Sequence, residues 1–151
     1  MKALLILFVS LFGVPLGDCT DYDGTDAIHQ TPPTDTMKLK ITVGKVVFTA
    51  TLYDNATTAT LKARLPLHLT MRELNHNEKY GTLPAPLPTD AAHPGTIQAG
   101  DLMLYGDDTV VLFYQTFSTS YRYTRLGKLD DVTGLTDALG SGDVPVTLAL
   151  E

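Results

Sequence analysis

Apolar and polar residues alternate with a period of two along several short segments of the chain. Residues 37–43 read MKLKITV, and residues 144–150 read VPVTLAL. This alternation is typical of strands that bury one face and expose the other. Further segments rich in β-branched, aromatic or alternating apolar residues are 46–53, 65–71, 101–105, 109–114 and 125–129. The pattern predicts a chain made mainly of short strands.

Turn residues separate these strands. Gly44-Lys45 predicts a tight turn between the first two strands, and Gly106-Asp107-Asp108 predicts another further along. Residues 75–89 are predicted to form a loop, because a glycine and several prolines interrupt them. Pro145 has no backbone N–H to donate, which predicts an edge or terminal position for it in the last strand.

Two short helices are predicted among the strands. Residues 56–65 follow the capping residue Asn55 and precede Pro66, and residues 132–139 end at Gly140. Many antiparallel strands in one small domain must close or stack in order to bury their apolar faces. The sequence therefore predicts a mainly β fold, a closed barrel with the two helices covering its ends.

The composition of the chain disfavours several classes of partner and site. The chain has 151 residues, enough for one ordinary domain, and a formal net charge of −6. An acidic surface disfavours nucleic acid as a partner. Its one cysteine cannot form an internal disulfide, and its four histidines lack the spacing of a zinc site, so no metal or other cofactor is expected. No internal apolar run is long enough to span a membrane.

The first 18 residues have the features of a signal peptide. Lys2 precedes an apolar run that Pro15 and Gly17 end, which predicts export to the periplasm, the cell envelope or the medium. A buried N-terminal strand or helix is the alternative. Cys19 follows a partial lipobox in which Asp18 is the misfit, so a lipid anchor and an unmodified thiol both remain open. Residues 19–36 are rich in Asp, Thr and Pro and predict a flexible linker to a domain at 37–151.

Several segments of this domain, in their order along the chain, resemble the cyclophilins. The hairpin around Gly44, the Gln98-Ala99-Gly100-Asp101 segment, the strand at 111–114 and the Leu126-Gly127-Lys128-Leu129 segment match cyclophilin pieces. A bacterial cyclophilin-like group is similar in further motifs: Leu65-Pro66-Leu67, Glu78-Lys79-Tyr80-Gly81-Thr82-Leu83-Pro84 and Ala99-Gly100-Asp101. The resemblance implies a closed eight-stranded β-barrel capped by two short helices.

The resemblance does not imply the prolyl isomerase activity of the cyclophilins. Cyclophilins place an arginine donor where this chain has Asp90, and an ionised carboxylate can only accept a hydrogen bond. Gln98 and Phe113 match the family pattern, while Tyr123 occupies the position of a pocket histidine. We therefore expect a groove beside Gln98, Phe113 and Tyr123 that binds a peptide or small molecule without efficient catalysis, and no catalytic residue is assigned. The alternative is an envelope peptidyl-prolyl isomerase that uses a relocated arginine: Arg64, Arg72 or Arg122.

Two further features are candidates for this groove. Glu78-Lys79 lies in the loop that the resemblance places over the barrel; it is either a functional polar pair or an exposed ion pair worth less than about 1 kcal/mol. Tyr121 and Tyr123 flank Arg122 in sequence, and together with Tyr114 they predict an aromatic cluster with rigid contact area for a ligand. Barrel packing is the simpler explanation for at least one of the three.

Overall fold

The structure is a computed structural model that describes residues 37–151. The predicted signal peptide, the linker and Cys19 lie outside the described residues. The N-terminal boundary of the described part falls just before the first predicted strand.

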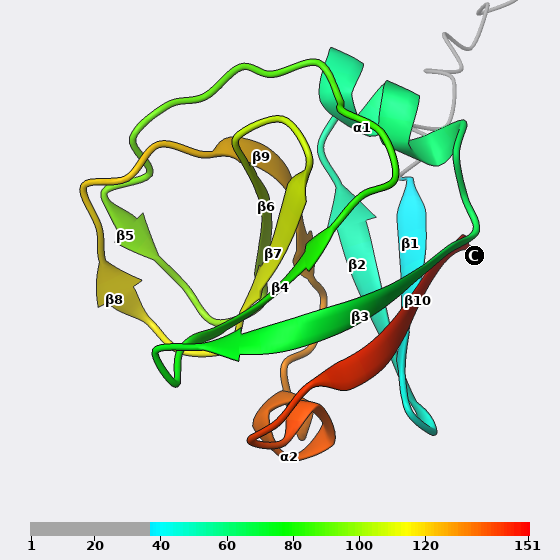
Figure 1. Cartoon of the computed structure of the whole chain (residues 1–151), viewed down its shortest axis with the longest axis vertical. Helices are drawn as coiled ribbons and strands as arrows, with labels where there is room; N and C mark the ends of the chain where they lie inside the picture. Colours follow the sequence, from blue (N-terminus) through cyan, green and yellow to red (C-terminus); the bar gives the residue numbers. More distant parts are fainter. Residues whose placement is uncertain (1–36) are drawn as a thin grey trace, which may run out of the picture. The chain divides into compact units, whose positions relative to one another are not determined.

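Eight strands close into an antiparallel barrel (Figure 1). Around the barrel they are β1 (Lys38–Val43), β10 (Val144–Leu150), β3 (Leu67–Leu74), β4 (Glu78–Thr82), β7 (Thr109–Phe113), β6 (Asp101–Tyr105), β9 (Thr124–Leu129) and β2 (Val46–Leu52). Two very short strands, β5 (Thr96–Ile97) and β8 (Phe117–Ser118), pair with each other in a separate ribbon. The predicted mainly β, closed eight-stranded barrel is confirmed.

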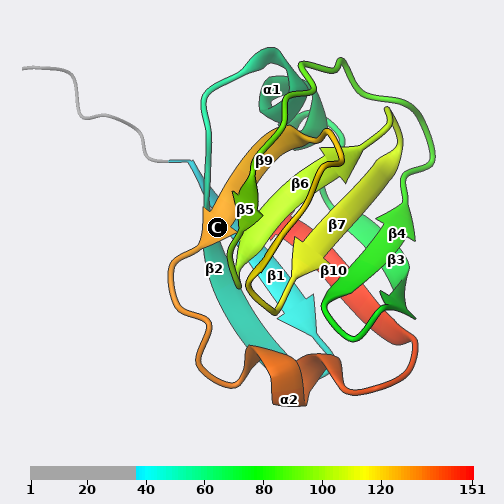
Figure 2. The same ribbon diagram turned by 90° about the vertical axis from the view of Figure 1, so that its left-hand side faces the viewer.

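The helices α1 (Ala56–Lys62) and α2 (Leu135–Leu139) lie at opposite ends of the barrel (Figures 1 and 2). Asn55 caps α1: its side chain accepts from the Thr58 backbone N–H, while the Thr58 hydroxyl is paired with the Asn55 backbone N–H. Both helices are shorter than predicted. The residue before Pro66 is disfavoured from helical geometry, and Gly134 takes a left-handed φ of 76° before the first turn of α2.

The predicted loop at 75–89 is wrong in one part, because β4 runs through it. Gly81 leaves room for two core side chains: a Cβ placed there would lie 3.3 Å from Met71 Cγ and 3.4 Å from Leu69 Cβ. This close approach lets β4 pair with β3 on one side and β7 on the other. Tertiary packing thus overrides the local turn signal.

Pro145 lies where the sequence predicted. It pairs with Thr70 of β3, but the pairing of β10 with β1 ends one residue later, at Val146. No ladder hydrogen bond to β1 is therefore lost at the proline.

Two apolar clusters share the strands β6 and β7. Val110 and Leu112 point into the barrel with the main core, whereas Val111 and Phe113 point outward. The outward cluster consists of Ile97, Met103, Val111, Phe113 and Tyr123, with Tyr80 and Phe117 packed against it. Strands buried on both faces need a covering layer outside the barrel, and Figure 2 shows β5 and the chain beside it in front of the barrel strands.

Gly127 lies where β9 and β2 approach each other closely to close the barrel. A Cβ at this position would collide with the Thr51 backbone oxygen and lie 3.1 Å from Leu52 Cα. We expect Gly127→Ala to lower the free energy of unfolding by about 2 kcal/mol or more, because backbone atoms cannot move aside cheaply. Urea denaturation measures this loss.

The matched control is Gly142→Ala, since a Cβ at Gly142 meets nothing within 4 Å. It should change the free energy of unfolding by less than about 0.5 kcal/mol. Equal effects of the two substitutions would contradict the close approach of β9 to β2.

Candidate functional site

A cavity of about 600 Å³ lies on the outer face of the barrel, between the strands β4, β6 and β7 and the segment that contains β8. Its strand side is lined by Leu74, Glu78, Tyr80, Tyr105, Thr109 and Val111. Its loop side is lined by Asn75, Asn77, Phe117, Ser118, Thr119, Ser120, Tyr121 and Tyr123. A concave site of this size, with aromatic walls and a few polar groups, is typical of small-ligand pockets.

Aromatic rings form a connected wall in and beneath the cavity. The Tyr105 and Tyr121 rings meet edge to face with centroids 6.1 Å apart, and Tyr105 lies 5.6 Å from Tyr123. Phe113 lies behind them, its centroid 5.5 Å from that of Tyr123 and 5.8 Å from that of Phe117. Tyr121 is 62% exposed and forms the rim, whereas Phe113 is fully buried. The inner part of this aromatic wall is buried, and its rim at Tyr121 is accessible to a ligand.

Glu78 is the acidic group of the cavity. Successive side chains of β4 point to opposite faces, so Glu78 and Tyr80 face the cavity while Lys79 faces the barrel interior. Glu78 is only 8% exposed as a residue, and its side chain makes no hydrogen bond or ion pair with any residue of the 37–151 domain. Its carboxyl oxygens keep some contact with solvent through the cavity. Burial, together with the nearby charge of Glu73, raises the pKa of Glu78 to about 7. This carboxyl is therefore poised between its two protonation states near neutral pH.

Lys79 belongs to a buried network on the other face of β4. Its Nζ lies 2.8 Å from Glu73 Oε2 and donates to the Gly142 carbonyl oxygen at 2.6 Å. The Tyr114 hydroxyl is 2.9 Å from both carboxylate oxygens of Glu73. Burial favours a higher pKa for Glu73, but the hydrogen bonds from Lys79 and Tyr114 outweigh it and hold the pKa below its usual value. The network joins β4 to β3 and to the segment after α2.

The structure brings four of the six predicted groove residues together. Glu78, Tyr121 and Tyr123 line the cavity, and Phe113 supports it from below. Gln98 lies apart: its side chain accepts a hydrogen bond from Lys128 Nζ at 2.7 Å. Gln98 is not among the lining residues.

Lys79 is the other predicted groove residue that lies apart. It is fully buried and bound to Glu73, so the alternative prediction of an exposed Glu78–Lys79 pair is wrong. The reason is the alternation along β4, which a loop would not have imposed.

Barrel packing, the alternative given above, holds for one of the three predicted tyrosines: Tyr114 packs into the barrel core, while Tyr121 and Tyr123 line the cavity. The clustering around Arg122 is wrong, because its guanidinium donates to the Ala91 carbonyl oxygen. Tyr80 and Tyr105 were missed. Tyr105 could have been found, because alternation from Leu102 and Leu104 points it outward in the predicted strand 101–105.

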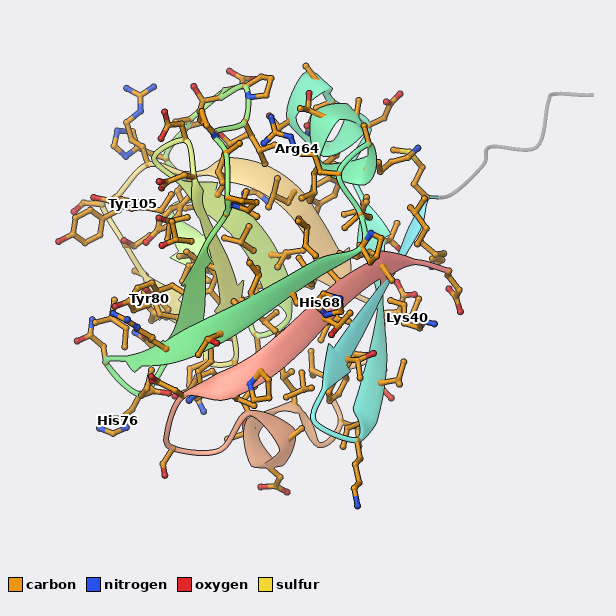
Figure 3. All side chains as sticks on the ribbon, turned by 45° about the vertical axis from the view of Figure 1, so that its right-hand side comes forward. Lys40, Arg64, His68, His76, Tyr80 and Tyr105 are labelled. Atoms are coloured by element: carbon orange, nitrogen blue, oxygen red, sulfur yellow. The ribbon has the colours of Figure 1, made fainter. Side chains whose placement is uncertain are left out.

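The three arginines considered as donors lie in different surroundings. Arg64 donates to the carbonyl oxygens of Ala85 and Pro86, and Figure 3 shows it near α1, away from Tyr80 and Tyr105. Arg122 is held by Ala91. Arg72 is exposed on the outer face of β3, directly across from Tyr80, although it does not line the cavity.

Between residues 37 and 151, no three His, Cys, Asp or Glu side chains are grouped to hold a metal ion. Across the same residues, no helix is long and apolar enough to cross a membrane.

Comparison with known families supports the resemblance noted in the sequence. The sequence profile of the cyclophilin-like family matches residues 41–149. The chain belongs to the cyclophilin-like family. The predicted family membership is therefore confirmed, and the matched range runs from β1 to β10 of this cyclophilin-like domain.

The fold is also similar to that of a hypothetical protein from Archaeoglobus fulgidus whose structure was determined in solution. The TM-score is 0.57 at 16% identity, over 77% of this chain and 95% of the archaeal one. At that identity the similarity shows that the two proteins share a fold. A comparison with curated proteins gave no match to this cyclophilin-like chain.

The raised pKa of Glu78 predicts a pH-dependent stability. Between pH 4.5 and about 7 the Glu78 carboxyl is protonated in the folded domain and ionised in the unfolded chain. The free energy of unfolding therefore falls as pH rises through this window. We expect Glu78→Gln to remove this loss, which makes the variant more stable than the wild type by roughly 2 kcal/mol near pH 8 and similar to it near pH 4. Urea denaturation across this range measures the difference.

The lowered pKa of Glu73 acts in another window, because its stabilisation is lost only as pH falls below 4.5. Glu151→Gln, at the exposed chain end, is the matched control and should keep the wild-type pH profile. A Glu78→Gln variant with that same profile would show that Glu78 is not buried as described.

Proposed function

We propose that this cyclophilin-like domain binds a small molecule or a peptide segment in the outer cavity, without efficient prolyl isomerisation. The observation that carries the proposal is the cavity itself, about 600 Å³ between the barrel wall and the β8 segment, with tyrosines on opposite sides. Tyrosines provide large, rigid contact areas with a polar tip, which suits reversible binding.

The polar groups of the cavity support the same proposal. Asn77 lines the cavity, and its Oδ1 is the buried side-chain oxygen of the domain at 37–151 that has no hydrogen-bond partner. A buried acceptor without a partner costs free energy, so a ligand donor that reaches it would gain that energy back on binding. Ser118, Thr119 and Ser120 add hydroxyl groups on the loop side.

Tyr121 provides the direct test. Because it is exposed at the rim, Tyr121→Ala should leave the fold intact while removing ring contact with a ligand. We expect fragments that bind the wild type, detected in an NMR screen by shifts at β4 and β8 amides, to lose about fivefold or more in affinity.

The matched control is Tyr53→Ala, a tyrosine that is 38% exposed and does not line the cavity. It should bind the same fragments as the wild type does. A screen in which no fragment shifts the cavity amides, or in which both variants lose affinity equally, would refute the proposed binding site.

A prolyl isomerase with a relocated arginine is the second candidate. The observation in its favour is Arg72, which lies across from Tyr80 on the outer face and whose side chain bonds to no residue in the described domain. Such an enzyme needs a donor to the proline nitrogen, and Arg72 offers a guanidinium on the outer face of β3, next to the cavity residue Tyr80.

A proline-peptide isomerisation assay separates the two candidates. We expect the wild type and Arg72→Ala to isomerise the peptide at the same rate, within about twofold of the uncatalysed reaction, because no arginine is among the residues that line the cavity. A rate enhancement that Arg72→Ala abolishes and Arg125→Ala, an exposed arginine of β9, preserves would establish the isomerase instead.

Export is a separate proposal that rests on the sequence of residues 1–18. We propose cleavage before Cys19, which leaves the linker in front of the barrel. Mass spectrometry of the full chain after bacterial expression should give a mature protein beginning at Cys19, with an added lipid mass if the cysteine is an anchor. An uncleaved chain in the cytoplasm would contradict export.

A further inference from the structure

The side chains that line the cavity include an acidic group and no basic group. Glu78 is the only ionisable carboxyl among the lining residues, and no lysine, arginine or histidine is among them. Lys79, its neighbour in the chain, points into the barrel and is already paired with Glu73. The cavity therefore presents a negative site to a ligand whenever Glu78 is ionised, and the charge of Glu73 behind it adds to that potential.

Within the described domain, Glu78 also lacks the hydrogen bond or ion pair that a buried carboxylate ordinarily has. The residue is more than nine-tenths buried, and its carboxyl oxygens keep only the solvent contact that the cavity gives them. No hydrogen bond or ion pair holds the side chain within the described domain. A buried charge without a partner is costly, and proteins ordinarily supply one. In this domain the missing partner is on the open side of the carboxyl, where the cavity is.

The tyrosine rings that line the same cavity as Glu78 fit the same kind of partner. Tyr105, Tyr121 and Tyr123 line the cavity, and the Tyr105 ring packs against the other two. The face of an aromatic ring attracts a cation, and the attraction grows when water is excluded. An anionic ligand would meet Glu78 with no basic side chain in the lining to offset the repulsion.

We propose that the ligand of this cavity is an organic cation, a protonated amine with an apolar body, whose charge pairs with the Glu78 carboxylate while its body packs against Tyr105, Tyr121 and Tyr123. This inference rests on the proposed function, because it names the chemical class of the ligand for the same cavity. The cation supplies the partner that the barrel itself does not provide.

The proposal predicts that binding strengthens with pH. The cation pairs with ionised Glu78, so binding must displace the proton that this carboxyl holds below a pKa of about 7. Affinity should therefore rise about tenfold from pH 6 to pH 8. Over this range Glu73 stays ionised, since its pKa lies below 4.5, and Tyr114 and Tyr123 stay neutral, since their pKa values are raised to about 12.

Two other charged groups lie near this part of the surface. Arg72 stands exposed on β3 beside Tyr80 and keeps its charge throughout. His76 stands on the exposed turn between β3 and β4, with its backbone N–H bound to Glu73. A His76→Asn variant separates any titration of this histidine from that of Glu78, and it should keep the pH dependence.

Three matched compounds test the inference on the full chain by NMR titration near pH 6 and near pH 8. They are 2-phenylethylammonium, neutral 2-phenylethanol and anionic 3-phenylpropanoate, which share a phenyl ring and differ in charge. We expect the cation to bind about tenfold more tightly than the alcohol near pH 8, with shifts at amides of β4 and β8. Glu78→Gln should abolish this preference, so that the variant binds the cation and the alcohol with about equal affinity.

The outcomes separate this inference from the proposed function. Equal or tighter binding of the alcohol or the anion overturns the cation while the cavity remains a binding site. A cation preference that survives in Glu78→Gln also overturns it, because the charge would then be recognised elsewhere. If none of the three compounds shifts the cavity amides, the inference fails, and the fragment screen with Tyr121→Ala decides the proposed function on its own.

Discussion

The alternation of side chains along β4 is the constraint on which the candidate site depends. Pairing with β3 and β7 fixes the register of this strand, so that Glu78 and Tyr80 face outward and Lys79 faces inward. Two oppositely charged neighbours in sequence therefore meet different surroundings. Lys79 pairs with Glu73 inside the barrel, whereas Glu78 lies at the wall of the cavity and pairs with no residue between 37 and 151.

The cavity follows from a second requirement of the barrel. Strands β6 and β7 are apolar on both faces, so the barrel core alone cannot bury them. The segments containing β5 and β8 cover the outer face, and Tyr123 and Phe117 pack against Phe113 beneath them. Where this cover does not meet β4, the space remains open, and its wall carries a buried carboxyl. The apolar pattern of β6 and β7 thus accounts both for the covered outer face of the barrel and for the position of the candidate binding site.

Most of the fold could be predicted because it depends on local patterns. Alternation predicted the strands, the cap at Asn55 predicted α1, and Pro145 was placed at a strand end. The two-residue strands β5 and β8 were missed, and so was β4, whose glycine and the prolines after it carry a turn signal. Its strand geometry comes from partners far away in the chain, and Gly81 serves the packing of Met71 rather than a turn.

The site was predictable to the extent that strand faces were known. Phe113, Tyr121, Tyr123 and Glu78 were expected near one another, and the structure brings them together. Lys79 was misplaced because a loop prediction imposes no alternation. Gln98 matches the family pattern in sequence, but its amide pairs with Lys128 outside the cavity lining. Similarity of a residue to a family motif therefore did not give its place relative to the cavity.

Glu78 is largely buried at the cavity wall, and no residue of the described domain forms a hydrogen bond or ion pair with its carboxyl. The most direct test is an NMR titration of the Glu78 side-chain carboxyl carbon in the full chain without ligand. The account predicts a midpoint at about 7. A midpoint near the ordinary value of 4.5 would mean that the carboxyl is solvated or already paired, and would contradict the account.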